Sequence, residues 1–113
     1  MQAIFLVIKQ VDMVDSIMEA LADAGIRGGT AIDSAGMARS ITHLNQNVAM
    51  VQLLRGILNG EDESHKSKTI FVIVKDEEVE AVKKAITDVT GDLSKPNAGI
   101  MFGVPVSFTE GIS

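Results

Sequence analysis

Two apolar segments with nearly the same pattern, 66 residues apart, constrain the fold of this chain more than any other feature. Residues 4–9 read IFLVIK, and residues 70–75 read IFVIVK. Each segment is short, rich in β-branched and aromatic residues, and uncharged until its last position, which is typical of a buried strand. The sequence therefore predicts two copies of one structural unit, each of which begins with a strand.

An amphipathic helix is predicted after each of these strands. Acidic residues come first, Asp12 in one copy and residues 76–78 in the other, and negative charge there suits the helix dipole. Apolar residues then recur at spacings of three and four. Gly25 and Gly91, again 66 residues apart, are well placed to end the two helices. The apolar positions are Val14, Ile17, Met18 and Leu21 in the first helix and Val79, Val82, Ile86 and Val89 in the second.

A second extended piece follows each helix, over residues 29–35 and 99–106, and completes a β-α-β-β-α-β order. This is the ferredoxin-like arrangement, an α+β fold with an antiparallel four-stranded sheet, and we expect one such domain over residues 1–113. The first and third strands then lie in the centre and the other two form the edges. Pro105 cannot donate to a neighbouring strand, so its place in an edge strand supports this order.

The two central strands are apolar at every position, over residues 3–8 and 70–74. A sheet that is covered by helices on one side only would alternate apolar and polar residues. The second face must therefore be covered as well, either by another copy of the chain or by the long segment between the second and third strands. We expect a homo-oligomer.

The long segment, residues 37–67, forms an inserted region between the second and third strands. Within it, residues 47–58 place apolar side chains on one face of a predicted helix, and Gly60 is a plausible stop. Residues 60–68 read GEDESHKSK and are predicted to form a solvated, charged loop. The predicted helix either packs on its own assembly or binds a partner protein.

Composition excludes several classes of function. The net charge is −5 and no stretch concentrates Lys and Arg, so nucleic acid is not an expected partner. There is no cysteine, which removes disulfides and thiolate chemistry. The longest uncharged apolar run is too short for a bilayer span or a signal peptide, so no membrane insertion is expected and a cytoplasmic location is predicted. The four phenylalanines, at positions 5, 71, 102 and 108, are expected to belong mostly to the core.

The chain resembles the P-II nitrogen-regulatory signalling proteins and their P-II-like relatives. The resemblance rests on the element order, on GGTAIDSAGMAR (28–39), on KTIFVIVKDEEVEAVKKAI (68–86) and on NAGIMFGVPV (97–106). It implies a homotrimer whose sheets line a central core. It also implies a regulator rather than an enzyme, which senses a small effector and engages a target protein, a transporter or a metabolic enzyme, through residues 37–67.

The resemblance also implies an effector site in clefts between subunits, where family members typically bind adenine nucleotides. Gly28, Thr30, Gly36 and Arg39 fit family positions at one wall of the cleft, and Gly99 fits the glycine-rich loop before the last strand. Ile100 stands where the family places a phosphate-binding lysine, and SFTEGIS (107–113) has no arginine. We therefore expect weak or absent ATP binding by the standard mode, no certain cofactor, and as effector an adenine nucleotide or another small anion. With no tyrosine in the chain, uridylylation of a loop tyrosine is excluded.

Other interpretations of the same residues remain open. Gly25, Gly28, Gly29 and Gly36 are each explained by the end of a helix or strand, without any ligand. A structural or metal-handling trimer, similar to the copper-tolerance proteins, would use His43 and His65, although neither shows a ligand-pair spacing and no metal site is predicted. A small enzyme with Asp33 or Asp92 as general base lacks a second catalytic group, and no catalytic residue is assigned.

Overall fold

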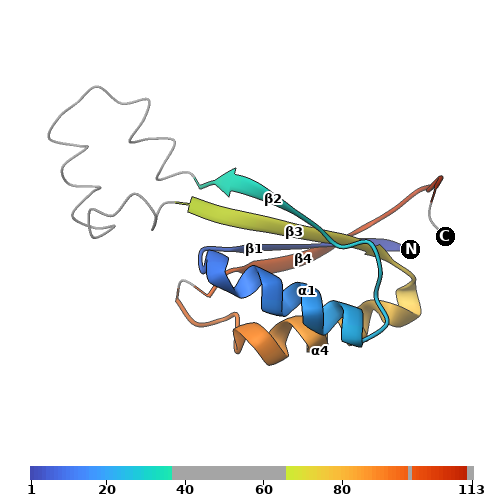
Figure 1. Cartoon of the computed structure of the whole chain (residues 1–113). Coiled ribbons are helices and arrows are strands. Elements are labelled where there is room, and N and C mark those ends of the chain that lie inside the picture. The colour runs from blue at the N-terminus through green and yellow to red at the C-terminus, as the bar shows by residue number, and fades with distance from the viewer. Residues whose placement is uncertain (37–65, 97, 112–113) are drawn as a thin grey trace, which may run out of the picture.

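The predicted α+β fold is confirmed by the computed structural model, which describes residues 1–36, 66–96 and 98–111. Across these residues one antiparallel sheet has the strand order β2-β3-β1-β4, so the first and third strands are central as expected. Figure 1 shows α1 and α4 side by side on one face of this sheet. The elements are β1 (Gln2–Ile8), η1 (Val11–Met13), α1 (Val14–Asp23), β2 (Thr30–Ala35), β3 (Lys66–Val74), η3 (Asp76–Glu78), α4 (Val79–Thr90) and β4 (Ile100–Pro105).

The core lies between the two helices and the face of the sheet that they cover. Alternate residues of β1 and β3 point into it, because successive side chains of a strand point to opposite faces. Leu6 and Ile70 are paired in the sheet and each is 1% exposed. Burying one such side chain stabilises the fold by about 1.5–3 kcal/mol. The fully buried side chains of this core are Leu6, Ile8, Ile17, Ile70, Val72, Val82 and Ile86.

Glycine ends the first helix, as the sequence predicts. Gly25 has φ +84°, a conformation that L side chains rarely adopt. Its N–H donates to the carbonyl of Ala22 at 3.0 Å, and the N–H of Ile26 donates to the carbonyl of Leu21 at 2.9 Å. This pair of bonds is the Schellman motif, and Ile26 and Leu21 also meet in the core. Gly91, at φ +76°, ends α4 in the second copy.

A short 3-10 turn precedes each helix and carries the acidic residues that the sequence places there. η3 continues directly into α4, and Glu78 at their junction accepts a hydrogen bond from the backbone N–H of Lys75 at 2.9 Å. A lysine side chain has no acceptor, so this single bond is the half of a capping box that can form. It fixes the direction in which the chain leaves β3.

The other face of the sheet carries apolar side chains that no element covers within the described residues. Phe5 stacks on Phe102 with ring centroids 5.1 Å apart and meets Phe71 at 5.8 Å. The expectation that the phenylalanines belong to the core is therefore wrong for the single chain, because these three lie on the face turned away from the helices and Phe108 is 79% exposed. We call this surface the open face; its most exposed apolar side chains are Ile32, Ile100, Phe102 and Val104.

The predicted charged loop over residues 60–68 is wrong at its C-terminal end, because β3 already begins at Lys66. Lys68 forms an ion pair with Asp33 of β2, and the hydroxyl of Ser67 lies 2.7 Å from that of Ser34. Cross-strand pairing thus takes up polar side chains that hydropathy alone assigns to a loop. The inserted region ends before Lys66, and the predicted helix over residues 47–58 lies outside the described residues.

Replacing Gly25 by alanine tests the helix stop. We expect Gly25→Ala to lower the free energy of unfolding by about 1–2 kcal/mol, since no atom lies within 4 Å of the added Cβ and the left-handed backbone alone is penalised. The measurement is urea unfolding followed by circular dichroism. Gly36→Ala is the matched control: its φ lies outside the left-handed region and it also faces open space, so a change within about 0.5 kcal/mol is expected. Equal losses in the two variants would contradict the assignment.

Candidate functional site

Two of the five predicted ligand residues, Gly36 and Gly99, lie at the same end of the sheet. Gly36 directly follows β2 and Gly99 directly precedes β4. In the sheet register Lys68 pairs with both Ile8 and Asp33, and Val7 pairs with Ile100, so β2, β3, β1 and β4 all reach this end. It is also the end from which the inserted region departs (Figure 1).

Gly99 holds the loop before β4 directly against the backbone of β1. Its φ is +125°, and a Cβ added there would lie 2.7 Å from the carbonyl oxygen of Val7 and 3.0 Å from Cγ2 of Ile8. Real Cβ atoms do not approach a carbonyl oxygen this closely. Glycine is therefore required here by packing, and a ligand role at this position would come in addition to that structural role.

Gly28 and Thr30 lie elsewhere. Thr30 pairs with Phe71 in the middle of the sheet, and Gly28, at φ +79°, belongs to the loop at the opposite end from Gly36. β2 and β4 are the two edge strands, three strand spacings or roughly 14 Å apart. A single chain therefore does not bring these residues together. Arg39 lies outside the described residues.

A hydroxyl cluster at the root of the inserted region was not predicted. Thr69 donates its hydroxyl to Ser34 at 3.0 Å, and Ser34 lies 2.7 Å from Ser67, which is 7% exposed. On the opposite face of the same two strands, Asp33 and Lys68 form their ion pair. The strands that lead into and out of the inserted region are thus joined on both faces. Sequence alone gives no signal for this, because it appears only once the register of β2 against β3 is known.

Asp92, one of the two residues considered as a general base, lies just after α4 and accepts two hydrogen bonds. Its Oδ1 accepts hydrogen bonds from the backbone N–H of Ser94 at 2.9 Å and from the Ser94 hydroxyl at 2.7 Å. These bonds favour the charged carboxylate and hold the pKa of Asp92 below its usual value. A carboxylate with a lowered pKa is a weaker base, so Asp92 is poorly suited to proton abstraction at neutral pH.

Residues 1–36, 66–96 and 98–111 carry neither a metal-binding cluster nor a membrane-spanning helix. No group of three or more His, Asp or Glu side chains in these ranges could hold a metal ion. His43 and His65 lie outside them, so the metal-handling alternative stays a prediction. In the same ranges no helix has the length and hydropathy needed to cross a bilayer.

Comparison with known proteins gives one clear similarity. The model of the family described as nitrogen regulatory protein P-II matches this sequence over residues 1–113, the whole chain. The inserted region and both halves of the repeat therefore lie inside the match. Among curated proteins, none matches the sequence.

A Gly99→Ala substitution tests the close approach of the loop to β1. We expect it to lower the free energy of unfolding by about 2 kcal/mol or more, because the added Cβ meets both a strained backbone angle and the Val7 carbonyl. Gly111→Ala is the matched control, since Gly111 has φ +85° but nothing within 4 Å. A loss of about 1–2 kcal/mol, as for Gly25→Ala, is expected there in the same urea titration. If the two variants lose the same stability, the contact with β1 is not what requires glycine.

Proposed function

Because this chain belongs to the nitrogen regulatory protein P-II family, we propose that it acts as a homotrimeric sensor that binds a small anionic effector and regulates a target protein through residues 37–67. Members of this family are signalling regulators rather than enzymes. The observation that carries the proposal is the open face, whose exposed aromatic and aliphatic side chains suit burial against further copies of the chain.

The open face supports self-association on physical grounds. Phe102 is 44% exposed, Ile32 is 49% exposed, and they lie on the two edge strands, so the apolar surface extends across the whole sheet. A contiguous apolar surface of this kind marks an interaction site in soluble proteins. Association would bury this surface. The hydrophobic effect would then contribute a stabilising free energy of about 25 cal/mol for each Å² of apolar surface removed from water.

Self-association would also bring candidate ligand residues of different copies close together. Gly36 follows one edge strand and Gly99 precedes the other, so the two meet only if β2 of one copy approaches β4 of the next. We propose that Gly28, Thr30, Gly36, Arg39 and Gly99 line effector clefts between neighbouring copies. Arg39 would supply a planar fork of donors for a phosphate or carboxylate group.

The proposed signal passes through the root of the inserted region. A ligand shifts a conformational equilibrium only if it binds the two states unequally. An effector held beside Gly36 contacts the chain at the point where the inserted region leaves β2. Since Asp33, Ser34, Ser67 and Lys68 tie the two strands together there, the sheet would act as the fixed base against which residues 37–65 move. A target protein would then bind one arrangement of that region in preference to another.

The oligomeric state is the first test. We expect the wild-type chain to be a trimer by size-exclusion chromatography with light scattering, and Phe102→Arg to shift it to monomer because a charged group would be buried at the interface. Val11→Arg is the matched control, since Val11 is 40% exposed against 44% for Phe102 but lies on η1 and not on a strand of the sheet. It should leave the trimer intact. A monomeric wild-type chain would refute the proposed assembly.

Effector binding is the second test. We expect a calorimetric screen of adenine nucleotides and small organic anions to yield a ligand whose affinity falls about tenfold or more in Arg39→Ala, since a charge-assisted hydrogen bond contributes about 1.5–3 kcal/mol. Lys84→Ala, on the exposed face of α4, removes the same charge elsewhere and should leave the affinity unchanged. The proposal fails if no anion stabilises the protein, or if the two substitutions weaken binding equally.

A further inference from the structure

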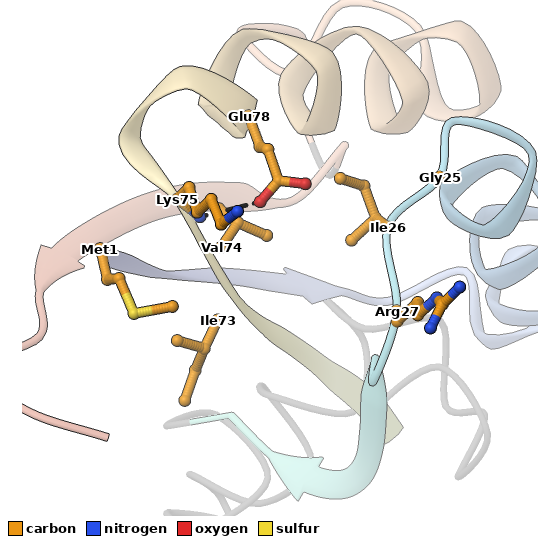
Figure 2. Close-up of a pocket in the computed structure, with 8 residues that line it drawn as sticks. All are labelled: Met1, Gly25, Ile26, Arg27, Ile73, Val74, Lys75 and Glu78. Carbon is orange, nitrogen blue, oxygen red and sulfur yellow. Dashed lines mark hydrogen bonds between the residues drawn. The ribbon is translucent and has the colours of Figure 1, made fainter. Parts of the chain in front are cut away.

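A cavity of about 240 Å³ lies at the end of the sheet opposite Gly36 and Gly99, between the loop after α1 and the C-terminal end of β3. Figure 2 shows the residues that line it, with Ile26 on the loop and Glu78 on η3 extending toward one another. None of the described ligand residues of the P-II resemblance lines it, although Gly28 follows Arg27 in the same loop. What this cavity binds is therefore a question separate from the proposed effector cleft.

The cavity exists because β2 begins too late to cover the whole of β3. Pairing between them ends at Thr30 and Phe71, so residues 72–74 of β3 have no strand neighbour on this side. The loop over residues 25–29 passes here instead, and no backbone hydrogen bond joins it to the end of β3 in the described structure. Every second residue of a strand directs its N–H and C=O to a given side, so this stretch of β3 edge offers unpaired backbone donors and acceptors.

Opposite charges face the cavity without neutralising one another. Lys75 and Glu78 both line it, and no ion pair joins them among the described residues. Oε1 of Glu78 is held by the backbone N–H of Lys75 at 2.9 Å, which fixes the carboxylate in place and leaves Oε2 available. The α-amino group of Met1, a third charge nearby, is already paired with Asp76 at 3.1 Å. One cation and one fixed anion thus remain for a ligand, since the guanidinium of Arg27 extends away from Lys75 and Glu78 in Figure 2.

The floor of the cavity is apolar. Ile26 is 7% exposed and Val74 is 3% exposed, and both belong to the hydrophobic core. The side chain of Met1 closes one side. A ligand that fills this space would lay an apolar group on the floor and keep its charged groups at the rim, where Lys75 and Glu78 lie.

We propose that this cavity binds a free amino acid with an apolar side chain. Its carboxylate would lie on Lys75 and its ammonium group on Glu78. Its side chain would rest on Ile26 and Val74. The volume agrees with a ligand of this size, because pockets for drug-sized molecules begin at about 300 Å³. A simple anion would leave Glu78 unpaired, and a simple amine would leave Lys75 unpaired, so the zwitterion matches the site best.

Three probes of the same shape separate the contributions of the two charges. L-leucine carries both charged groups, isoamylamine lacks the carboxylate, and 4-methylpentanoate lacks the ammonium group. We expect calorimetry on the full chain to show one leucine per chain, with each analogue weaker by about tenfold or more. L-glutamate, which would place a charge on the apolar floor, is expected to bind more weakly than leucine by a similar factor.

Two substitutions assign each charge to its residue. Glu78→Gln keeps an oxygen that can accept the Lys75 N–H and should lower leucine affinity about tenfold while leaving 4-methylpentanoate unaffected. Lys75→Gln should lower leucine affinity similarly while leaving isoamylamine unaffected. Glu77→Gln and Lys84→Gln, which change the same charges on exposed positions away from the cavity, are the controls and should bind leucine as the wild type does.

The proposal is overturned if leucine shows no saturable binding at millimolar concentration. It is also overturned if either cavity variant, still folded by circular dichroism, binds leucine as the wild type does, or if the control variants lose as much affinity as the cavity variants. None of these results bears on the trimer or on Arg39. The proposed effector cleft therefore stands or falls by its own tests.

Discussion

The pairing of β1 with β3 in the middle of the sheet, with apolar side chains on both faces, is the constraint on which the rest of the structure depends. On one face Leu6 and Ile70 form the floor on which both helices pack. On the other face Phe5 and Phe71 remain partly exposed. Two helices cannot cover both sides of one sheet, so a chain with this centre does not bury all of its apolar surface alone.

The internal repeat explains why the fold was predictable from the sequence. Several local signals agree on one topology: the strand and helix periods, the two helix-ending glycines and the proline in an edge strand. A sequence whose local signals all favour the same fold specifies that fold. The boundary at Lys66 was missed because the extension of β3 is polar. Its residues are held by partners on β2, through the pair Asp33 and Lys68 and the hydroxyls of Ser34 and Ser67. Hydropathy reports burial, and these positions are stabilised by pairing instead.

The candidate site was predictable only in part, and for a different reason. The resemblance to the P-II family pointed to five positions along the chain, but it could not say how far apart they lie in one copy. Glycine also has several uses: at Gly99 the close approach to Val7 already requires it, so its presence there is not by itself a sign of a ligand. The cavity beside Ile26 had no sequence signal at all. It arises from the point at which β2 stops pairing with β3, which is a property of register.

The two edges of the sheet help to explain why the proposed assembly is a ring and not a pair joined edge to edge. A two-fold dimer that joins sheets edge to edge pairs equivalent edges, so β2 would meet β2 or β4 would meet β4. Either arrangement keeps Gly36 and Gly99 of different copies apart, because they belong to opposite edges. A head-to-tail contact joins β2 of one copy to β4 of the next, and repeating it closes into a ring when the rotation allows. With the open faces turned inward, such a ring covers the aromatic side chains and uses both free edges in the same step, which removes the two features that leave the single chain incomplete.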